Sequence, residues 1–338
     1  MRFRISVIEG DGIGPEVTSS ALKVLEKVSL KYGIDIEVKK VDAGDEAVKK
    51  YGTAIPESSW KEIINSHAIL KGPVGESAGE VVVKIRRGLD LYANIRPARN
   101  YPNVDSLKKD VDLIIVRENT EDVYIRAENV ISEGVTIALR LITKKASERI
   151  GRTAFELAKS RRRKVTIVHK ANVLTLTDGL FKTTIKDLKK YYPEVEIDEE
   201  YIDSAVMDLV RRPEKFDIIV TTNLYGDILS DLAAYITGSI GLAPSANIGD
   251  EKAMFEPVHG AAFDIAGKGI ANPTAMILCT GWMLKWLGEK YKEENVRMGG
   301  ISVENAVLSA LSKKDNLTPD LGGSTTTERF TDAVLSLL

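Results

Sequence analysis

The 338-residue chain contains no glutamine, only one cysteine and no long hydrophobic run. A single cysteine excludes an internal disulfide bond. No stretch has the roughly 18 consecutive apolar residues of a membrane-spanning helix, and the N-terminus lacks the apolar core of a secretory signal peptide. We therefore expect a cytoplasmic protein. The missing glutamine, beside abundant Lys, Arg and Glu, is typical of proteins from thermophiles.

Neither sign of charge dominates, since the net charge is −2. The composition therefore gives no reason to expect a nucleic acid or a membrane as partner. An apolar content of 43% and a charged content of 28% are those of a globular protein. At this length we expect two lobes, unless the chain forms a single large barrel. Cys279 lies in the apolar segment AMILCTGWML, which predicts a buried helix position and not a nucleophile.

Short apolar strands alternate with longer helical segments, which predicts an α/β protein with a largely parallel sheet. Residues 15–33 have apolar positions at helical spacing and end in glycine, so they form the clearest helix. Residues 124–150 contain two alternating stretches around Gly134, which fit either an arm that pairs with another subunit or a hairpin at the sheet edge. Seven strands are predicted, at residues 5–10, 34–44, 67–75, 111–119, 164–172, 195–203 and 216–223.

Three aspartates and one lysine carry the clearest chemical signal. Asp227 and Asp231 are four residues apart in a predicted helix, so their side chains point the same way. Asp203 follows an apolar strand and could complete an all-oxygen site for Mg²⁺ or Mn²⁺. Lys170 follows another strand and would lie near that site as a proton carrier or charge clamp. Together they predict chemistry on an anionic, oxygen-rich substrate.

Three arginines lie near strand or helix ends, namely Arg86, Arg96 and Arg117. They could hold carboxylates in bidentate fashion. The alternative is that they are solvated surface groups, which is our interpretation of Arg87. Tyr124 could act as a phenolic acid, although tyrosine is more often structural.

The glycine-rich loop GDGIGPE at residues 10–16 follows a strand and precedes a helix. It departs from the G-x-G-x-x-G fingerprint, because its three glycines alternate and Pro15 and Glu16 open the helix. An acidic loop is also a poor binding site for pyrophosphate. The loop is interpreted as a tight turn that lets a ligand approach the backbone.

Seven motifs, in their order and spacing, resemble those of the β-decarboxylating dehydrogenases of 2R-hydroxyacids. This family contains the 3-isopropylmalate, isocitrate and homoisocitrate dehydrogenases. The resemblance covers about residue 5 to residue 330, nearly the whole chain. The motifs are GDGIGPE, LDLYANIRP, RENTEDVY, VHKANV, NLYGDILSD, EPVHGAAFDIAGKGIANPTA and TPDLGG.

The resemblance implies oxidation of a hydroxyl to a ketone by hydride transfer to NAD, followed by loss of CO₂, with Mg²⁺ or Mn²⁺. The expected reaction is oxidative decarboxylation of 3-isopropylmalate to 4-methyl-2-oxopentanoate, a step of leucine biosynthesis. Isocitrate, homoisocitrate or a range of alkylmalates are alternative substrates. A non-catalytic regulatory subunit of the same fold is an alternative of another class, but such subunits typically lose a catalytic residue, and here all are present.

The resemblance also assigns the site residues. Because the family's site is shared, it implies a homodimer, with tetramers as a further possibility. The metal would be bound by Asp227 and Asp231 of one subunit and Asp203 of its partner. The partner's Lys170 would be the base, Tyr124 would protonate the enolate carbon, and Asn172 would lie near the nicotinamide. The two malate carboxylates would be held by Arg86, Arg96 and Arg117.

The substrate's third group is expected to contact Val82 and Val83, with Val173 from the partner. These valines could bury an isopropyl group, with about 1 kcal/mol for each methyl group. Glu80 would repel a third carboxylate. The alternative is that the valines are ordinary core residues.

The family binds its dinucleotide without a classical Rossmann unit, in a loop that matches residues 256–273. Asp264 would accept hydrogen bonds from the adenosine ribose and repel a 2′-phosphate, so NAD is favoured over NADP. Asp320 supports this choice. The predicted NAD-contacting residues are Gly72, Pro73, His259, Gly260, Ala261, Asp264, Ile265, Asn272 and Asp320.

The implied architecture is a two-lobed isopropylmalate/isocitrate dehydrogenase-like α/β fold with parallel and mixed sheets. Residues 1–98 and 236–338 would form the dinucleotide-binding lobe. Residues 99–235 would form the dimerisation and metal/substrate lobe, with an arm near 125–145. The active site is expected in the cleft between the lobes.

Overall fold

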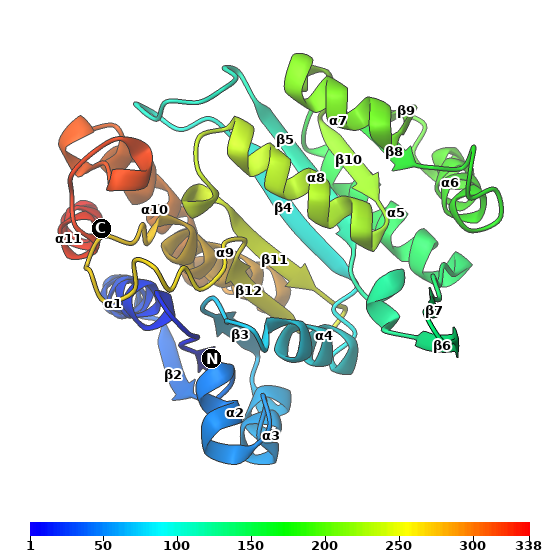
Figure 1. The fold of residues 1–338 in the computed structure, drawn as a ribbon. Helices are drawn as coiled ribbons and strands as arrows, with labels where there is room; N and C mark the ends of the chain where they lie inside the picture. The colour runs from blue at the N-terminus through cyan, green and yellow to red at the C-terminus, as the bar shows by residue number, and fades with distance from the viewer.

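The structure, a computed structural model, describes residues 1–338 (Figure 1). The helices are α1 (Gly14–Tyr32), α2 (Asp45–Tyr51), α3 (Glu57–Asn65), α4 (Ala78–Gly88), α5 (Lys144–Lys159), α6 (Thr177–Asp187), α7 (Ile202–Arg211), α8 (Asn223–Ile236), α9 (Thr274–Tyr291), α10 (Glu294–Leu311) and α11 (Thr327–Leu337). The strands are β1 (Arg2–Ile8), β2 (Asp35–Lys40), β3 (Ala68–Lys71), β4 (Ala93–Arg99), β5 (Asp112–Glu118), β6 (Glu128–Ser132), β7 (Val135–Ala138), β8 (Lys164–His169), β9 (Glu196–Tyr201), β10 (Ile218–Thr221), β11 (Pro244–Ile248) and β12 (Ala253–Pro257).

Ten strands form one mixed sheet in the order β2-β1-β3-β12-β11-β4-β5-β10-β8-β9. The pairs β12–β11, β11–β4 and β4–β5 are antiparallel, and the other pairs are parallel. The predicted α/β class with a mixed sheet is therefore confirmed, as are all seven predicted strands. β4, β11 and β12 were not predicted. β4 contains Pro97, a residue that usually argues against a central strand.

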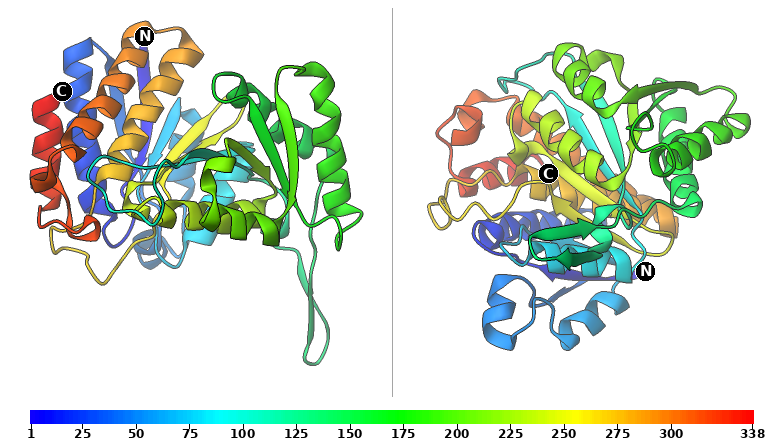
Figure 2. Two further views of the ribbon diagram at one scale, coloured as in Figure 1. Left: turned by 90° about the horizontal axis from the view of Figure 1, so that it is seen from above. Right: turned by 45° about the vertical axis from the view of Figure 1, so that its right-hand side comes forward.

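The helices of the two ends of the chain pack together around the largest hydrophobic cluster, which draws 37 residues mainly from α1, α9, α10, α11 and the strands they cover. Figure 2 shows these helices grouped at one end of the molecule and the segment containing α5–α7 at the other. Two smaller clusters, of 15 and 12 residues, lie around β5, β8 and β10. The division at residues 98 and 236 stays a prediction.

The first helix shows why the sequence folds this way. Val17, Ala21, Val24 and Val28 share one face of α1 and are fully buried. Gly33 ends the helix with φ +63° and donates its backbone N–H to a carbonyl of the last turn. This predicted helix is confirmed.

The predicted burial of Cys279 is also confirmed. It lies in the interior of α9 with no exposed surface. Burial raises the pKa of its thiol to about 12, so the reactive thiolate is disfavoured.

The segment around Gly134 forms a hairpin of β6 and β7 that pairs with no other strand. Every residue of both strands is exposed. Figure 2 shows the hairpin projecting from the body of the molecule. The interpretation as a hairpin at the edge of the main sheet is therefore wrong, and the hairpin has the shape of an arm.

The glycine-rich loop brings three backbone segments together. Gly10 and Gly12 have positive φ, and Cβ atoms there would lie 2.0 Å from the carbonyl oxygens of Pro73 and Ala261. Backbone N–H groups of this loop donate to the same two oxygens at 2.8 Å. The tight turn was predicted correctly, but its glycines are required by neighbouring backbone and not by an approaching ligand.

None of the helices combines the length and apolar character required to cross a membrane.

Candidate active site

A cavity of about 670 Å³ lies between α4, the strand ends of β3, β4, β5 and β12, and the start of α8. Arg86, Arg96 and Arg117 all line it, although they come from α4, β4 and β5. All three are buried, so the interpretation as solvated surface groups is wrong for them. Arg87 on the same helix is exposed, as predicted.

Antiparallel pairing of β4 and β5 places two of these arginines side by side. Arg117 stands opposite Asn94, two residues before Arg96. The Arg96 Nε donates to the Asn94 side chain at 2.7 Å, and the Arg117 Nε donates to Asn223 at 2.8 Å. Each guanidinium is thus held by an amide through its Nε, and its Nη1 donates to groups of α8, namely Asp227 and, for Arg96, also Ser230.

Asp227 on α8 is the acid that faces the arginines. It accepts from Arg117, from Arg96 at 3.3 Å and from the Tyr124 hydroxyl at 2.5 Å. Burial acts to raise the pKa of Asp227, but Arg117 and Arg96 outweigh it and lower the pKa. One turn later, burial raises the pKa of Asp231 despite Arg96 at 3.5 Å.

Tyr124 lies beside this acid, in the short 3-10 turn Val123–Ile125 that follows β5. Burial raises its pKa, and the neighbouring Asp227 carboxylate adds to this shift, although the Arg117 guanidinium acts to lower it. The neutral phenol is therefore the form present near neutral pH, so Tyr124 can donate a proton.

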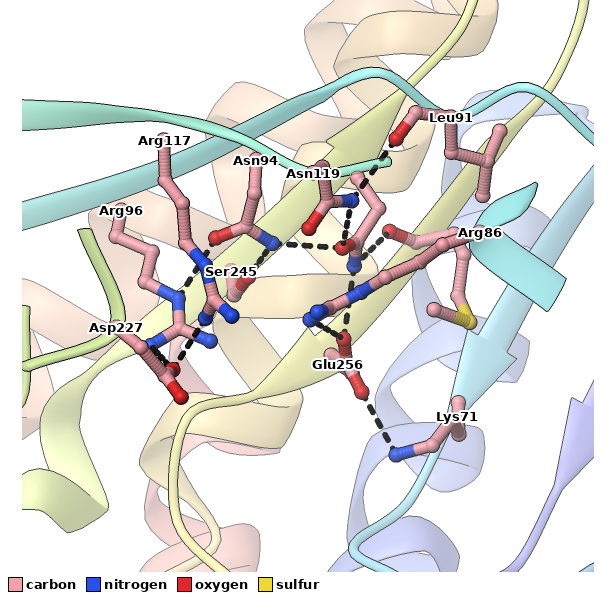
Figure 3. Close-up of polar contacts among 12 residues, drawn as sticks. Lys71, Arg86, Leu91, Asn94, Arg96, Arg117, Asn119, Asp227, Ser245 and Glu256 are labelled. Atoms are coloured by element: carbon pink, nitrogen blue, oxygen red, sulfur yellow. Dashed lines mark hydrogen bonds and ion pairs between the residues drawn. The ribbon is translucent and has the colours of Figure 1, made fainter. Parts of the chain in front are cut away.

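Figure 3 shows a second buried ion pair that the sequence reasoning missed. Glu256, on β12, contacts Lys71 at 2.7 Å and Arg86 at 3.1 Å, and it accepts from Asn247 at 2.9 Å. Burial acts to raise the pKa of this carboxyl, but Lys71 and Arg86 dominate and hold it far below the usual value. The sequence signal that could have indicated this ion pair is a charged residue at the end of each of two apolar strands, Lys71 in β3 and Glu256 in β12.

Asn247 connects this ion pair to the paired arginines. Its side-chain oxygen accepts from Asn94 at 2.6 Å and from Asn119 at 2.9 Å. Asn94 in turn accepts from Arg96 (Figure 3). A continuous buried network therefore runs from Lys71 to Arg96, and it fixes the positions of the cavity's charged groups.

Lys170 and Asp203, the other two residues of the predicted metal and base site, lie apart from the cavity. Lys170, after β8, forms an ion pair with Asp203 on α7, and neither residue lines the cavity. The side chain of Asp203 is 61% exposed, and a hydrogen bond from Lys170 lowers its pKa. Asn172 and Val173, in the same loop, are exposed as well.

A single chain therefore does not assemble the acids into one site. No group of three potential ligands among His, Cys, Asp and Glu lies close enough to hold a metal ion. Within one chain, the expectation that Asp203 joins Asp227 and Asp231 is wrong. The arrangement that the family resemblance implies, in which the third acid comes from a partner subunit, stays a prediction.

A further arginine links the two halves of the site. Arg140, just after β7, contacts Asp122 at 2.6 Å and also Asp178. Both of these acids are fully buried. Asp178 accepts the backbone N–H of Lys170 at 2.6 Å, and Asp122 lies two residues before Tyr124. Arg140 thus holds the base of the arm to the loop that carries the lysine.

Val82 and Val83 lie on the cavity face of α4, one turn before Arg86, and both are half-buried. They line the cavity, so the alternative that they are ordinary core residues is wrong. Glu80 is exposed and does not line the cavity. The expectation that Glu80 repels a third carboxylate in this site is therefore wrong, because its position on the helix points it to solvent.

A second cavity, of about 610 Å³, adjoins the first, and His259 and Gly260 line both. Ile265, Asn272 and Asp320, which are among the residues predicted to contact NAD, also line it. Pro73 lines the first cavity, whereas Gly72 and Ala261 are buried and line neither cavity. Asp264 is exposed on the loop next to this cavity and is not part of its lining.

The residues present fit the implied groups. His259 Nε2 is buried without a hydrogen-bond partner, and burial lowers the pKa of this imidazole. The neutral ring therefore has a free polar atom between the two cavities that a ligand could contact. Arg86 Nε is likewise buried and unpartnered. Asp227 and Asp231, four apart on α8, offer the carboxylate oxygens that hard divalent cations prefer, but they supply only part of a coordination shell.

The fold and this site define a decarboxylating dehydrogenase. The model of the isocitrate/isopropylmalate dehydrogenase family matches residues 4–334, and the chain belongs to that family. A solved isocitrate dehydrogenase from Methylococcus capsulatus superposes with a TM-score of 0.93 at 40% identity, over 100% of this chain and 99% of the other. The predicted family and enzyme class are confirmed.

Several relatives match over nearly their full length. The 3-isopropylmalate dehydrogenase of Saccharolobus solfataricus is 52% identical over 99% of both chains. That of Sulfurisphaera tokodaii is 49% identical over 100% of both chains. The isocitrate/homoisocitrate dehydrogenase of Thermus thermophilus is 50% identical over 100% of this chain and 99% of its own.

Proposed function

We propose that this protein catalyses the NAD-dependent oxidative decarboxylation of 3-isopropylmalate, as in leucine biosynthesis in the cytoplasm. The observation that carries the proposal is the pair Val82 and Val83 beside Arg86 in a cavity with three buried arginines. The arginines suit the two carboxylates of a malate, and the valines suit a branched apolar substituent. The relatives named 3-isopropylmalate dehydrogenase support this choice of substrate.

In this proposal, Arg86, Arg96 and Arg117 bind and orient the substrate. Bound in this way, the substrate would have its hydroxyl-bearing carbon beside Asp227, which contacts both Arg117 and Tyr124. Because the guanidinium groups are already held by Asn94, Asn223 and Glu256, little order is lost when the substrate binds.

The proton transfers are assigned to two residues of this chain. Lys170, contributed by the partner subunit, takes the proton of the substrate hydroxyl. Tyr124 gives a proton to the carbon that loses CO₂, and its raised pKa keeps that proton available at neutral pH.

Two groups would supply the remaining chemistry. NAD, held by the segments around His259 and Asn272, would accept the hydride. Mg²⁺ or Mn²⁺, held by Asp227 and Asp231 with Asp203 of the partner subunit, would polarise the substrate oxygens. Asp264, exposed at the edge of the second cavity, and Asp320, in its lining, make it acidic, which favours NAD over NADP.

The proposal includes a homodimer with shared active sites. Large apolar side chains are exposed on the arm and on the outer faces of α7 and α8, among them Val130, Met207, Ile228 and Tyr235. Val173 and Leu176, in the loop after Lys170, are 66% and 86% exposed. Exposed apolar surface of this extent is typical of a subunit interface. Burying it in a dimer would bring Lys170 toward a neighbouring cavity.

A substrate panel tests the proposal. Purified protein with Mg²⁺ and NAD is assayed for NADH formation with 3-isopropylmalate, isocitrate, homoisocitrate and malate. We expect the highest kcat/KM with 3-isopropylmalate and NAD, and low activity with NADP. Faster turnover of isocitrate than of 3-isopropylmalate would contradict the assignment. The Lys170→Met variant, which keeps the length of the side chain without the amine, serves as the inactive control.

A further inference from the structure

Arg126 lines the substrate cavity and has no partner within the chain. It lies between the turn that carries Tyr124 and the first strand of the arm. Its guanidinium forms no ion pair or side-chain hydrogen bond. An unpaired guanidinium at the mouth of a cavity that binds anions is available to a ligand.

The guanidinium of Arg126 lies near the face of α4 that lines the cavity. Gly79, Val82, Val83 and Arg86 follow the i, i+3, i+4, i+7 spacing, so they share one face of α4, and all four line the cavity. A Cβ placed on Gly79 would lie 3.8 Å from Nη2 of Arg126. The guanidinium therefore lies over the first turn of α4.

This face of α4 therefore has a guanidinium at each end, Arg126 near Gly79 and Arg86 one turn beyond the valines. Seven residues of helix separate Gly79 from Arg86, a rise of about 10 Å, and the valines lie near the middle of that distance. A malate held at Arg86 with a 3-isopropyl group would end at the valines. A substituent that continues past the valines and ends in a carboxylate would reach toward Arg126.

Neither of the two acids nearby is paired with Arg126. Glu128 lines the cavity but forms no ion pair with Arg126, and Glu80 is exposed and outside the lining. We propose that Arg126 is a specificity-determining residue that lets this cavity also accept malates whose 3-substituent ends in a carboxylate, of which isocitrate and homoisocitrate are the available probes. The proposal rests on the proposed function, because it uses the same arginines to hold the malate.

The Arg126→Gly variant provides a test with little risk to folding. Arg126 has φ +56°, a conformation that glycine adopts more readily than arginine. We expect the ratio of kcat/KM for isocitrate to kcat/KM for 3-isopropylmalate to fall about tenfold or more, because a charged hydrogen bond to the third carboxylate is lost. The same fall is expected with homoisocitrate. Arg126→Lys should keep part of the preference, since the charge remains.

Arg87→Ala is the matched control, because Arg87 is an exposed arginine on α4 that lies outside the cavity. It should leave the substrate ratio unchanged. An unchanged ratio in Arg126→Gly, an equal loss for all substrates, or a higher KM for NAD with an unchanged ratio would each overturn the proposal.

The wild-type protein separates failure of this inference from failure of the proposed function. If the wild type oxidises 3-isopropylmalate but is neither active with nor inhibited by isocitrate or homoisocitrate, the role of Arg126 is overturned and the proposed function stands. No oxidation of 3-isopropylmalate overturns the proposed function, and the assignment of Arg126 is then withdrawn with it.

Discussion

Two ion pairs of this chain occupy opposite surroundings. Lys71 and Glu256 pair in the interior, with side-chain exposures of 4% and 7%, whereas Lys170 and Asp203 pair at the surface, with exposures of 26% and 61%. The interior pair is held further by Arg86 and Asn247. The surface pair lines neither the substrate cavity nor the cavity beside it.

The difference shows that one chain completes the buried charge network around the cavity but does not bring Lys170 and Asp203 to it. Interior charges need several partners to offset the loss of water, so the network around Glu256 is complete within the chain and positions Arg86 before any ligand arrives. The surface pair carries no such cost and gains little from its own contact. Its exposure leaves it open to contact with a second molecule, as the proposed shared site requires.

The largest expected effect tests whether the two halves meet between subunits. Lys170→Met and Asp231→Asn should each lower kcat about 100-fold or more, because the first removes the proposed base and the second a proposed metal ligand. After subunits of the two variants are exchanged by co-expression, about one quarter of the sites should be intact if a homodimer shares its sites. The measurement is specific activity of the purified mixture against 3-isopropylmalate.

The control for this experiment is a mixture of the separately purified variants assayed before exchange, which should remain inactive. Size-exclusion chromatography establishes that each variant is dimeric. Absence of recovered activity in co-expressed dimers would show that Lys170 and Asp231 do not complement each other between subunits, and the comparison of the two halves would then need another explanation.

The next effect concerns stability of the interior pair. Glu256→Gln should lower the free energy of unfolding by about 3 kcal/mol at pH 7, because Lys71 and Arg86 lose their buried counter-charge. The measurement is urea denaturation followed by circular dichroism. Asp203→Asn is the matched control, and it should leave the urea midpoint nearly unchanged, because the surface pair is solvated.

The same pair of variants gives a pH dependence with a definite sign. The folded-state pKa of Glu256 is lowered from 4.5, so its contribution to stability is fully present above that value and is lost as the pH falls below it. The stability difference between wild type and Glu256→Gln should therefore shrink on acidification below pH 4.5. A difference that grows in acid would refute the depressed pKa.

The smallest expected effect tests which face of α4 recognises the substrate. Glu80→Ala should change the ratio of kcat/KM for isocitrate and 3-isopropylmalate by less than about twofold, because Glu80 faces solvent. Val83→Ala, on the cavity face, should lower kcat/KM for 3-isopropylmalate by more than Glu80→Ala does, because apolar contact with the isopropyl group is lost. A larger change in Glu80→Ala than in Val83→Ala would contradict the placement of this helix.

Much of the fold could be predicted because it depends on local patterns. The apolar stretches of β1, β5, β8 and β10 read directly as strands, and the buried face of α1 follows from its 3.6-residue period. The central strand β4 was not predicted, because Pro97 and two arginines interrupt its apolar pattern. Its pairing with β5 depends on partners that only the folded chain brings together.

Prediction of the site is limited in the same way, because some of its contacts join residues far apart in the sequence. The residue types at Arg86, Arg96, Arg117 and Asp227 are enough to indicate carboxylate chemistry. Nothing local indicates that Glu256, more than 150 residues after Arg86, is its counter-charge. Glu80 was assigned to the pocket from its distance along the chain, whereas its direction depends on how α4 is rotated against the sheet.

The sequence by itself determined the α/β class, the family and the chemical character of the site, because these follow from apolar periodicity and from motifs read in order. The tertiary structure alone decided which charges meet. It placed Glu256 against Lys71 and Arg86, set Arg126 over α4, and left Lys170 and Asp203 outside the cavity. The physical reason is that ion pairing and burial depend on distances in space, and long-range contacts across the sheet set those distances.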